Sequence, residues 1–156
     1  MKNWTKDTVS EKYKLYGKML YRTCIVYLKN RYDAEDAVQE TFYKLMLNSK
    51  NFTDPLYERK WLFCVTKNIC KNMLKSKHRS QVTYDDTLAM STENNTDNEI
   101  LNLVNALKDK YRDVVLLYYF EGSDVNETAM TLGISVSAVK MRLKRARELL
   151  KIELEE

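Results

Sequence analysis

Residues 126–150 read NETAMTLGISVSAVKMRLKRARELL, and this stretch predicts two helices joined by a tight turn. Asp124 followed by Glu127 is a helix-start pattern, because the first carboxylate accepts an orphan backbone N–H and the second reaches back to the cap. Gly133 can take the left-handed conformation that ends a helix without a Cβ clash. Ser135 is expected to cap the next helix. This order of elements predicts a helix-turn-helix.

The second of these helices has two contrasting faces. Its apolar residues recur with helical spacing and form one stripe: Val139, Leu143, Ala146 and Leu150. The remaining face holds Ser137, Lys140, Met141, Lys144, Arg145 and Glu148. Five cations fall within residues 140–147. A basic helix face is often merely solvated, but the second helix of a helix-turn-helix enters the major groove of DNA, which favours DNA binding here.

The composition limits the classes of protein to which this chain can belong. The chain has 156 residues with 44% hydrophobic and 31% charged content, enough for one or two small cores. No apolar run approaches the ~20 residues that span a bilayer, and residues 1–14 lack the apolar stretch of a signal peptide. We therefore expect no membrane insertion and a cytoplasmic location.

The chain offers little for metal, cofactor or catalytic chemistry. Cys24, Cys64 and Cys70 are an odd set without CxxC spacing, so we predict three small core residues instead of a disulfide framework or zinc site. His78 is the single histidine, and three glycines make no phosphate-binding loop. Neither a nucleophile–base set nor a metal-binding carboxylate cluster is recognisable. We expect no cofactor, no metal and no enzymatic activity.

The pattern along the chain predicts an all-α fold in two modules. Residues 80–99 carry five acidic and no basic side chains with little apolar periodicity, which is typical of a linker. Strand-like alternation is scarce elsewhere. The expected parts are an N-terminal domain at 1–79, a linker at 80–98 and a C-terminal domain at 99–156. Residues 1–90 carry 17 Lys and Arg against 10 Asp and Glu, so a second nucleic-acid surface is plausible there.

Helical periodicity predicts three helices in the N-terminal domain, over residues 10–30, 33–47 and 57–76. Their expected core residues are Leu20, Cys24, Tyr27 and Leu28 in the first, Ala37, Val38, Thr41, Phe42 and Leu45 in the second, and Leu62, Val65, Ile69 and Met73 in the third. The C-terminal domain is expected to place two further helices before the helix-turn-helix, and Asp109 is the expected cap of the second.

Three motifs, in order, resemble a known family. They are DAEDAVQETFYKL at 33–45, WLFCVTKNICKNMLKSKHR at 61–79, and LKDKYRDVVLLYYFEG at 107–122 followed by the helix-turn-helix and RLKRAREL. Together they resemble the extracytoplasmic-function (ECF) RNA polymerase sigma factors of the sigma-70 class over nearly the whole chain. The resemblance implies a promoter-directing factor that binds the clamp coiled coil and flap of core RNA polymerase, double- and single-stranded promoter DNA, and a separate anti-sigma factor.

The resemblance also implies site residues. In the family the acidic second helix docks on the polymerase clamp, at positions that match Asp33, Glu35, Asp36, Gln39 and Glu40. Taken alone, such a run is more often a solvated acidic face. The third helix of the family captures a flipped base, which must offset an unstacking cost of a few kcal/mol. The matching positions are Lys67, Asn68, Lys71 and Asn72, with Asn68 as the base reader. Trp61 matches a characteristic tryptophan but is equally well explained as a core aromatic.

In the C-terminal domain the resemblance assigns promoter readers. Base-reading positions match Lys140, Met141, Lys144 and Arg145, while Ser137 and Arg142 are placed on phosphate. Ala138, Ser137 and Thr128 depart from the family's usual Thr, Gly and larger aliphatic residue. Since base choice depends on which side chains reach the groove edges, the recognised DNA sequence stays open.

Two other functions compete with this interpretation. A free-standing helix-turn-helix regulator would need a dimer interface and has no use for an acidic docking helix followed by a melting helix. An enzyme acting on nucleic acid would need a catalytic set that the sequence lacks.

Overall fold

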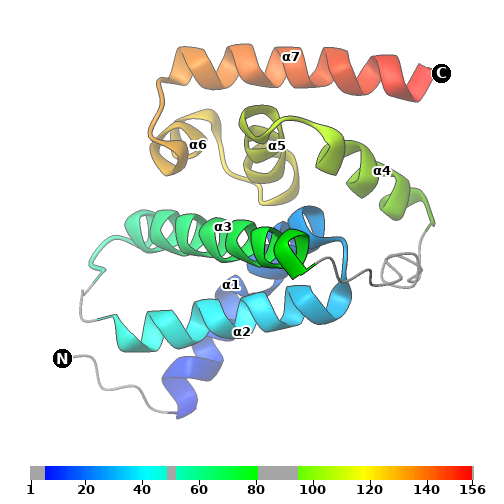
Figure 1. The fold of residues 1–156 in the computed structure, drawn as a ribbon. Helices are drawn as coiled ribbons and strands as arrows, with labels where there is room; N and C mark the ends of the chain where they lie inside the picture. Colours follow the sequence, from blue (N-terminus) through cyan, green and yellow to red (C-terminus); the bar gives the residue numbers. More distant parts are fainter. Residues whose placement is uncertain (1–5, 49–51, 81–94, 156) are drawn as a thin grey trace. The chain divides into compact units, whose positions relative to one another are not determined.

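The computed structural model describes residues 6–48, 52–80 and 95–155, and every regular element within these ranges is helical (Figure 1). The predicted all-α fold is confirmed. Two compact units divide the chain, an N-terminal unit at Met1–Met90 and a C-terminal unit at Ser91–Glu156. The helices are α1 (Lys6–Leu28), α2 (Arg31–Leu47), α3 (Pro55–Ser80), α4 (Asn95–Ala106), α5 (Asp109–Val115), α6 (Val125–Leu132) and α7 (Val136–Glu155).

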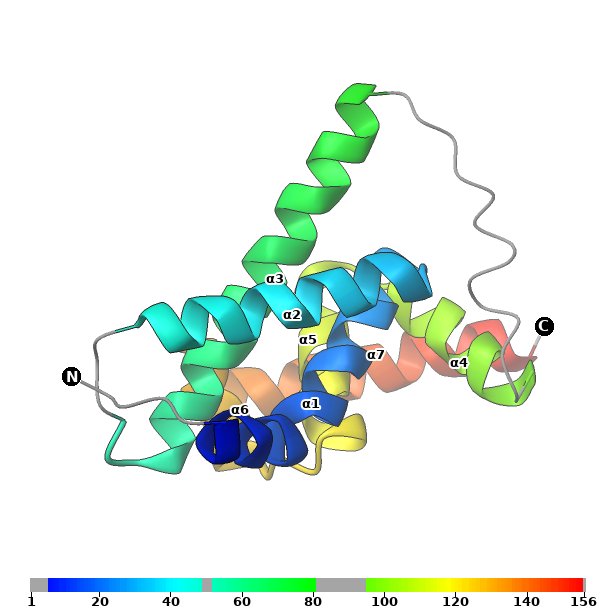
Figure 2. The same cartoon turned by 90° about the horizontal axis from the view of Figure 1, so that it is seen from below.

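The core of the N-terminal unit lies where the apolar faces of α1, α2 and α3 meet. All the core residues predicted for the first two helices are buried. In α3 Leu62 and Ile69 are buried, whereas Val65 and Met73 are half-buried. The last turns of α3 run beyond α2 (Figure 2), and their side chains at Leu74, Lys75 and Ser76 are exposed.

Helix boundaries in this unit differ from the predicted ones because of caps. Lys29 takes a φ of 57° and ends α1 early, and Asn30 caps α2, which begins at Arg31. The Asn30 Oδ1 atom accepts the backbone N–H groups of Tyr32 at 2.9 Å and Asp33 at 3.1 Å. At α3 the Asp54 side chain accepts the N–H of Leu56 at 2.9 Å, so the helix begins at Pro55, where a missing N–H costs nothing.

Buried polar contacts join the three helices. Glu58, at the start of α3, is buried and its Oε1 atom accepts hydrogen bonds from the Tyr16 hydroxyl at 2.8 Å and the Lys12 ammonium at 2.7 Å. Burial, and then the contact with Glu58, raise the pKa of Tyr16 above its usual value, so the hydroxyl stays a donor. Between α2 and α3 the hydroxyls of Thr41 and Thr66 share a 3.0 Å hydrogen bond. Glu58 therefore fixes α1 to α3 through a single oxygen.

The prediction that all three cysteines lie in the core is confirmed for two of them and wrong for the third. Cys24 and Cys70 are buried, and their contact, together with burial, raises the pKa of the Cys24 thiol. Cys64 is exposed because it falls on the outer face of α3. No cluster of three or more histidine, cysteine or acidic side chains suited to a metal occurs among the residues that the structure describes.

In the C-terminal unit the cap predicted at Asp109 is wrong. Lys108 occupies the cap position without a side-chain hydrogen bond, and Asp109 is the first helical residue of α5. There its carboxylate pairs with the buried guanidinium of Arg112, which also donates to the carbonyl oxygen of Asn105 in α4 at 3.2 Å. A carboxylate in the first turn is favoured by the helix dipole, and this position also lets it neutralise Arg112.

Further along this unit, α5 passes into a π-helical turn at Leu116–Phe120, and α6 and α7 follow. Arg147 of α7 donates to the Tyr119 hydroxyl of that turn at 3.0 Å. At the other end of the unit, α4 begins at Asn95, inside the range expected to be linker.

Over the ranges that the structure describes, none of the helices combines the length and the apolar character that crossing a bilayer requires.

Candidate polymerase and DNA-binding surfaces

The outer face of α2 carries the residues predicted to bind polymerase. Glu35, Asp36, Gln39 and Glu40 are exposed, and the neighbouring Ala34, Ala37, Val38 and Thr41 are buried. Asp33 differs, since it lies half-buried in the first turn. The structure therefore brings four of the five residues onto one solvent-facing strip, which we call the α2 acidic face. Glu40 lies 3.9 Å from Lys44, at the outer limit of an ion pair, so its charge remains available to a partner.

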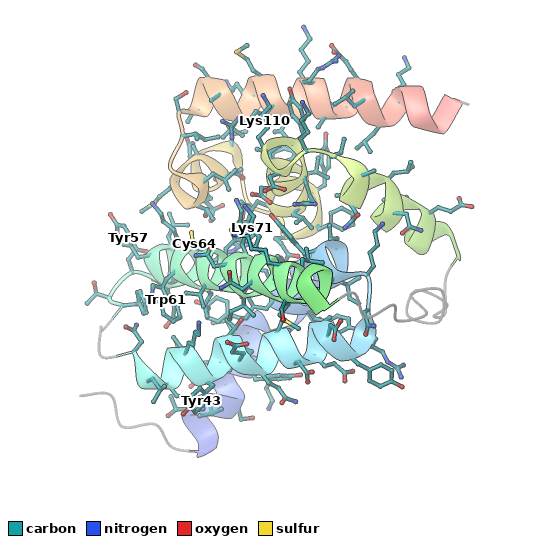
Figure 3. All side chains as sticks on the ribbon, in the orientation of Figure 1. Tyr43, Tyr57, Trp61, Cys64, Lys71 and Lys110 are labelled. Atoms are coloured by element: carbon teal, nitrogen blue, oxygen red, sulfur yellow. The ribbon has the colours of Figure 1, made fainter. Side chains whose placement is uncertain are left out.

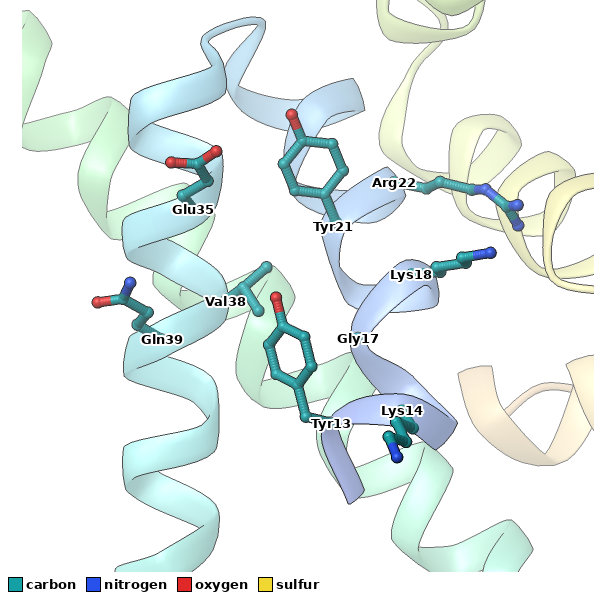
Figure 4. A pocket seen from close by; sticks show the side chains of 9 residues that line it. All are labelled: Tyr13, Lys14, Gly17, Lys18, Tyr21, Arg22, Glu35, Val38 and Gln39. Atoms are coloured by element: carbon teal, nitrogen blue, oxygen red, sulfur yellow. The ribbon is translucent and has the colours of Figure 1, made fainter. Parts of the chain in front are cut away.

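A groove of about 710 Å³ runs between α1 and α2 beside this face (Figure 4). Glu35, Val38 and Gln39 line it from α2, and the rings of Tyr13 and Tyr21 point toward α2 from α1. The lining is completed by Lys14, Gly17, Lys18 and Arg22. The groove thus extends the α2 acidic face with an aromatic border.

Sequence reasoning missed the α1 side of this groove. The available signal was Gly17, since an isolated glycine inside a helical pattern costs about 1 kcal/mol relative to alanine and so marks a position to inspect. A Cβ at Gly17 would lie 3.4 Å from the Tyr13 ring, an ordinary contact, so the glycine is not forced by sterics. Gly17 lines the groove together with the two tyrosines.

The outer face of α3 holds the residues predicted to capture a base. Asn68 and Asn72 are exposed, while Lys67 and Lys71 are half-buried beside them. The opposite side of the helix is buried at Thr66, Ile69 and Cys70. Donors, acceptors and cations therefore share one side of the helix, which we call the α3 amide face.

Aromatic side chains continue the α3 amide face toward the start of the helix. Figure 3 labels Tyr57, Trp61, Cys64 and Lys71 along α3, and their sequence separations of four, three and seven residues are helical spacings. Trp61 is half-buried, with its ring centroid 5.8 Å from that of Phe52, so it is neither fully core nor freely exposed. Tyr57, which sequence reasoning missed, is 56% exposed and could stack on an unpaired base. The spacing of four from Trp61 was the signal for it.

The helix-turn-helix has the caps that were predicted. Asp124 Oδ1 accepts the N–H of Glu127 at 2.7 Å, and Glu127 Oε1 accepts the N–H of Asp124 at 3.0 Å. Gly133 adopts φ 68° and ψ 35°, which ends α6 in the left-handed conformation. Ser135 Oγ accepts the N–H of Ala138 at 3.0 Å and caps α7. These local contacts fix where α6 begins and ends and where α7 begins.

The basic face of α7 presents most of the predicted promoter readers to solvent. Val139, Leu143 and Ala146 are buried toward the unit's core. The predicted readers exposed on the other side are Ser137, Lys140, Met141, Lys144 and Arg145, and Glu148 is exposed on this side as well. Arg142 is half-buried at the edge of the strip, and Arg145 pairs with Glu148 at 3.3 Å. We call the exposed strip the α7 reading face.

Comparisons with known proteins follow the same division of the chain. The family model described as sigma-70 region 2 matches residues 13–80, and the model described as sigma-70, region 4 matches residues 97–150. The chain is 30% identical to the ECF RNA polymerase sigma factor SigM of Bacillus subtilis, over 92% of this chain and 93% of SigM. It is 27% identical to SigW of the same organism, over 99% of this chain and 92% of SigW.

Two solved structures share the fold. CnrH, determined in complex with the cytosolic domain of CnrY, superimposes with a TM-score of 0.73 at 22% identity, covering 97% of this chain and 90% of CnrH. The sigma factor RpoE of Bartonella quintana, determined with the anti-sigma factor NepR, gives 0.71 at 22% identity, covering 97% and 98%. With both family models in order and a curated relative matched along almost its full length, the chain belongs to the ECF RNA polymerase sigma factors of the sigma-70 class.

Proposed function

We propose that this chain binds core RNA polymerase through the α2 acidic face and directs it to promoters read by the α7 reading face and the α3 amide face. The observation that carries the proposal is the pairing, on one chain, of an exposed acidic strip in the unit matched to region 2 with a capped basic helix-turn-helix in the unit matched to region 4. RNA synthesis stays with the polymerase, and the chain acts in the cytoplasm, where polymerase and chromosome are.

The side chains on α7 and on α3 suit different parts of the promoter. Cations on α7 suit phosphate and guanine contacts in duplex DNA. The amides and aromatic rings on α3 suit an unstacked base, which needs an edge to hydrogen-bond and a surface to stack on. The two solved neighbours were determined with CnrY and with the anti-sigma factor NepR, which supports a protein antagonist for this chain as well.

Reconstitution tests the proposal directly. The full chain is added to core RNA polymerase from its host, and run-off transcripts are sequenced from a library of host promoter fragments. Transcripts sharing an upstream element and an element near the start site are expected only when the chain is present. If the chain neither binds core polymerase nor changes the promoters that are used, the proposal is wrong.

The α3 amide face gives a sharper prediction. Asn68→Ala removes an exposed amide that can both donate and accept, with no loss of core packing. We expect transcription from a closed duplex to fall about fivefold to 30-fold, the effect of one or two lost hydrogen bonds at about 1 kcal/mol each. Transcription from a template with a pre-opened bubble of the same sequence should fall less, because capture no longer has to offset unstacking.

Asn102→Ala is the matched control, since it removes an exposed amide from α4 in the other unit. It should leave the ratio of the two templates unchanged. Equal losses on closed and pre-opened templates for Asn68→Ala would remove this residue from duplex opening.

A further inference from the structure

Met141 is the exposed apolar residue of the α7 reading face. Its side chain is 73% exposed, the largest exposed fraction among the large hydrophobic residues that the structure describes as exposed. Single exposed apolar residues are common on protein surfaces and carry no meaning by themselves. The position of Met141 on α7 is what makes it informative.

Helix geometry places Met141 opposite the core. At about 100° per residue, Met141 lies roughly 170° around α7 from the middle of the stripe formed by Val139, Leu143 and Ala146. These three side chains are buried, so Met141 points away from the unit. Arg142, by the same geometry, lies beside the stripe, in agreement with its half-buried state. Met141 therefore occupies the middle of the reading face.

The neighbours of Met141 on this face are polar or cationic. Ser137 precedes it by one turn, and Lys144 and Arg145 follow it by one turn, all exposed. A surface with this charge suits the phosphates that border the major groove. Once the cations hold α7 in the groove, the side chain in the middle of the face meets base edges.

Base edges in the major groove offer Met141 one matching group. A thioether is at best a weak acceptor and donates nothing, so it cannot read the polar atoms of adenine, guanine or cytosine well. The C5-methyl group of thymine is the apolar feature of that edge, and apolar side chains contact it. Methionine is unbranched and adaptable, which lets its terminal methyl group reach such a contact from a central position.

We propose that Met141 reads the C5-methyl group of a thymine in the upstream promoter element. The proposal rests on the proposed function, because it requires the α7 reading face to lie in the major groove of that element. The contact would specify thymine at one position of the element, and the cationic side chains of α7 do not specify that base.

Methyl deletion on the DNA tests the contact. The preferred upstream element is first selected from a pool of random duplexes by holoenzyme formed from core polymerase and the full chain. Each thymine is then replaced in turn by deoxyuridine, which removes only the methyl group, and holoenzyme binding is measured. We expect one replacement to weaken binding about three- to fivefold, the effect of burying a methyl-sized group.

Protein variants complete the cycle. Met141→Ala should bind the thymine and deoxyuridine elements equally, whereas Met141→Leu should keep the discrimination, so the two replacements isolate the contact as a double-mutant cycle. Folding is not at risk, because Met141 is exposed. Discrimination that survives in Met141→Ala, or an element whose thymines all tolerate deoxyuridine, would overturn the contact but not the promoter-reading function. A holoenzyme without any preferred element would overturn both.

Discussion

Replacing Asp36 and Glu40 together by lysine is expected to weaken binding of the chain to core RNA polymerase by about a hundredfold or more. Both side chains are exposed on the α2 acidic face, and neither contacts the core. The double substitution turns two negative charges into two positive ones. We expect the acidic face to dock on a basic surface of the polymerase, where the new lysines would meet like charges, and such contacts cost several kcal/mol. The free chain should keep its helicity, since the buried stripe of α2 is untouched.

The measurement is the affinity of the full chain for core polymerase in a pull-down or by fluorescence titration. Glu11→Lys with Glu99→Lys is the matched control, because it makes the same change in net charge at exposed positions outside α2. The control should bind core polymerase with nearly unchanged affinity. An Asp36→Lys/Glu40→Lys variant that binds as tightly as the original chain would show that this face does not meet the polymerase.

The second large effect is expected on the α7 reading face, where base reading and phosphate contact should separate. Lys140→Ala or Arg145→Ala should each remove about 1–3 kcal/mol of discrimination, roughly fivefold to 150-fold, at one position of the upstream element. Arg142 lies at the half-buried edge of the face. Its replacement by alanine should instead lower affinity for cognate and scrambled DNA by similar factors.

Holoenzyme binding to cognate and scrambled upstream duplexes, measured at several salt concentrations, distinguishes the two kinds of contact. Losing a phosphate contact reduces the slope of log affinity against log salt by about one. Arg145 needs one further check, because its pairing with Glu148 at 3.3 Å must open or rearrange when it reaches a base. Full sequence preference in both Lys140→Ala and Arg145→Ala would mean that α7 enters DNA in another orientation.

Local chemistry explains why much of the fold could be predicted. The Asp124–Glu127 capping box, the left-handed Gly133 and the Ser135 cap each depend on residues within one turn, so their sequence pattern determines their geometry. The apolar stripe of α2 was equally readable, because burial of a helix face follows its spacing. The five residues predicted for polymerase binding could be placed on one helix in the same way.

What the sequence did not reveal depends on contacts between helices or on competing local partners. Aspartate is a residue type that often caps helices, but the carboxylate of Asp109 pairs with the buried Arg112 from within the first turn of α5. Cysteine is a residue type that is usually buried, but the position of Cys64 along α3 puts it on the outer face of the helix. The groove beside Glu35 depends on how α1 packs on α2, which no periodicity within α1 specifies. The binding roles of the site residues stay predictions until the variants above are measured.

The buried carboxylate of Glu58 has a thermodynamic consequence. Lys12 and Tyr16 lie on α1, which borders the groove, and both donate to the Oε1 atom of Glu58. Glu58 stands at the start of α3, the helix that carries Asn68. A partner that shifts α1 must therefore strain this junction or move α3 with it. Any cooperativity between polymerase bound at the groove and a base bound on α3 is then reciprocal. If bound polymerase raises the affinity for the base by some factor, the bound base raises the affinity for polymerase by the same factor.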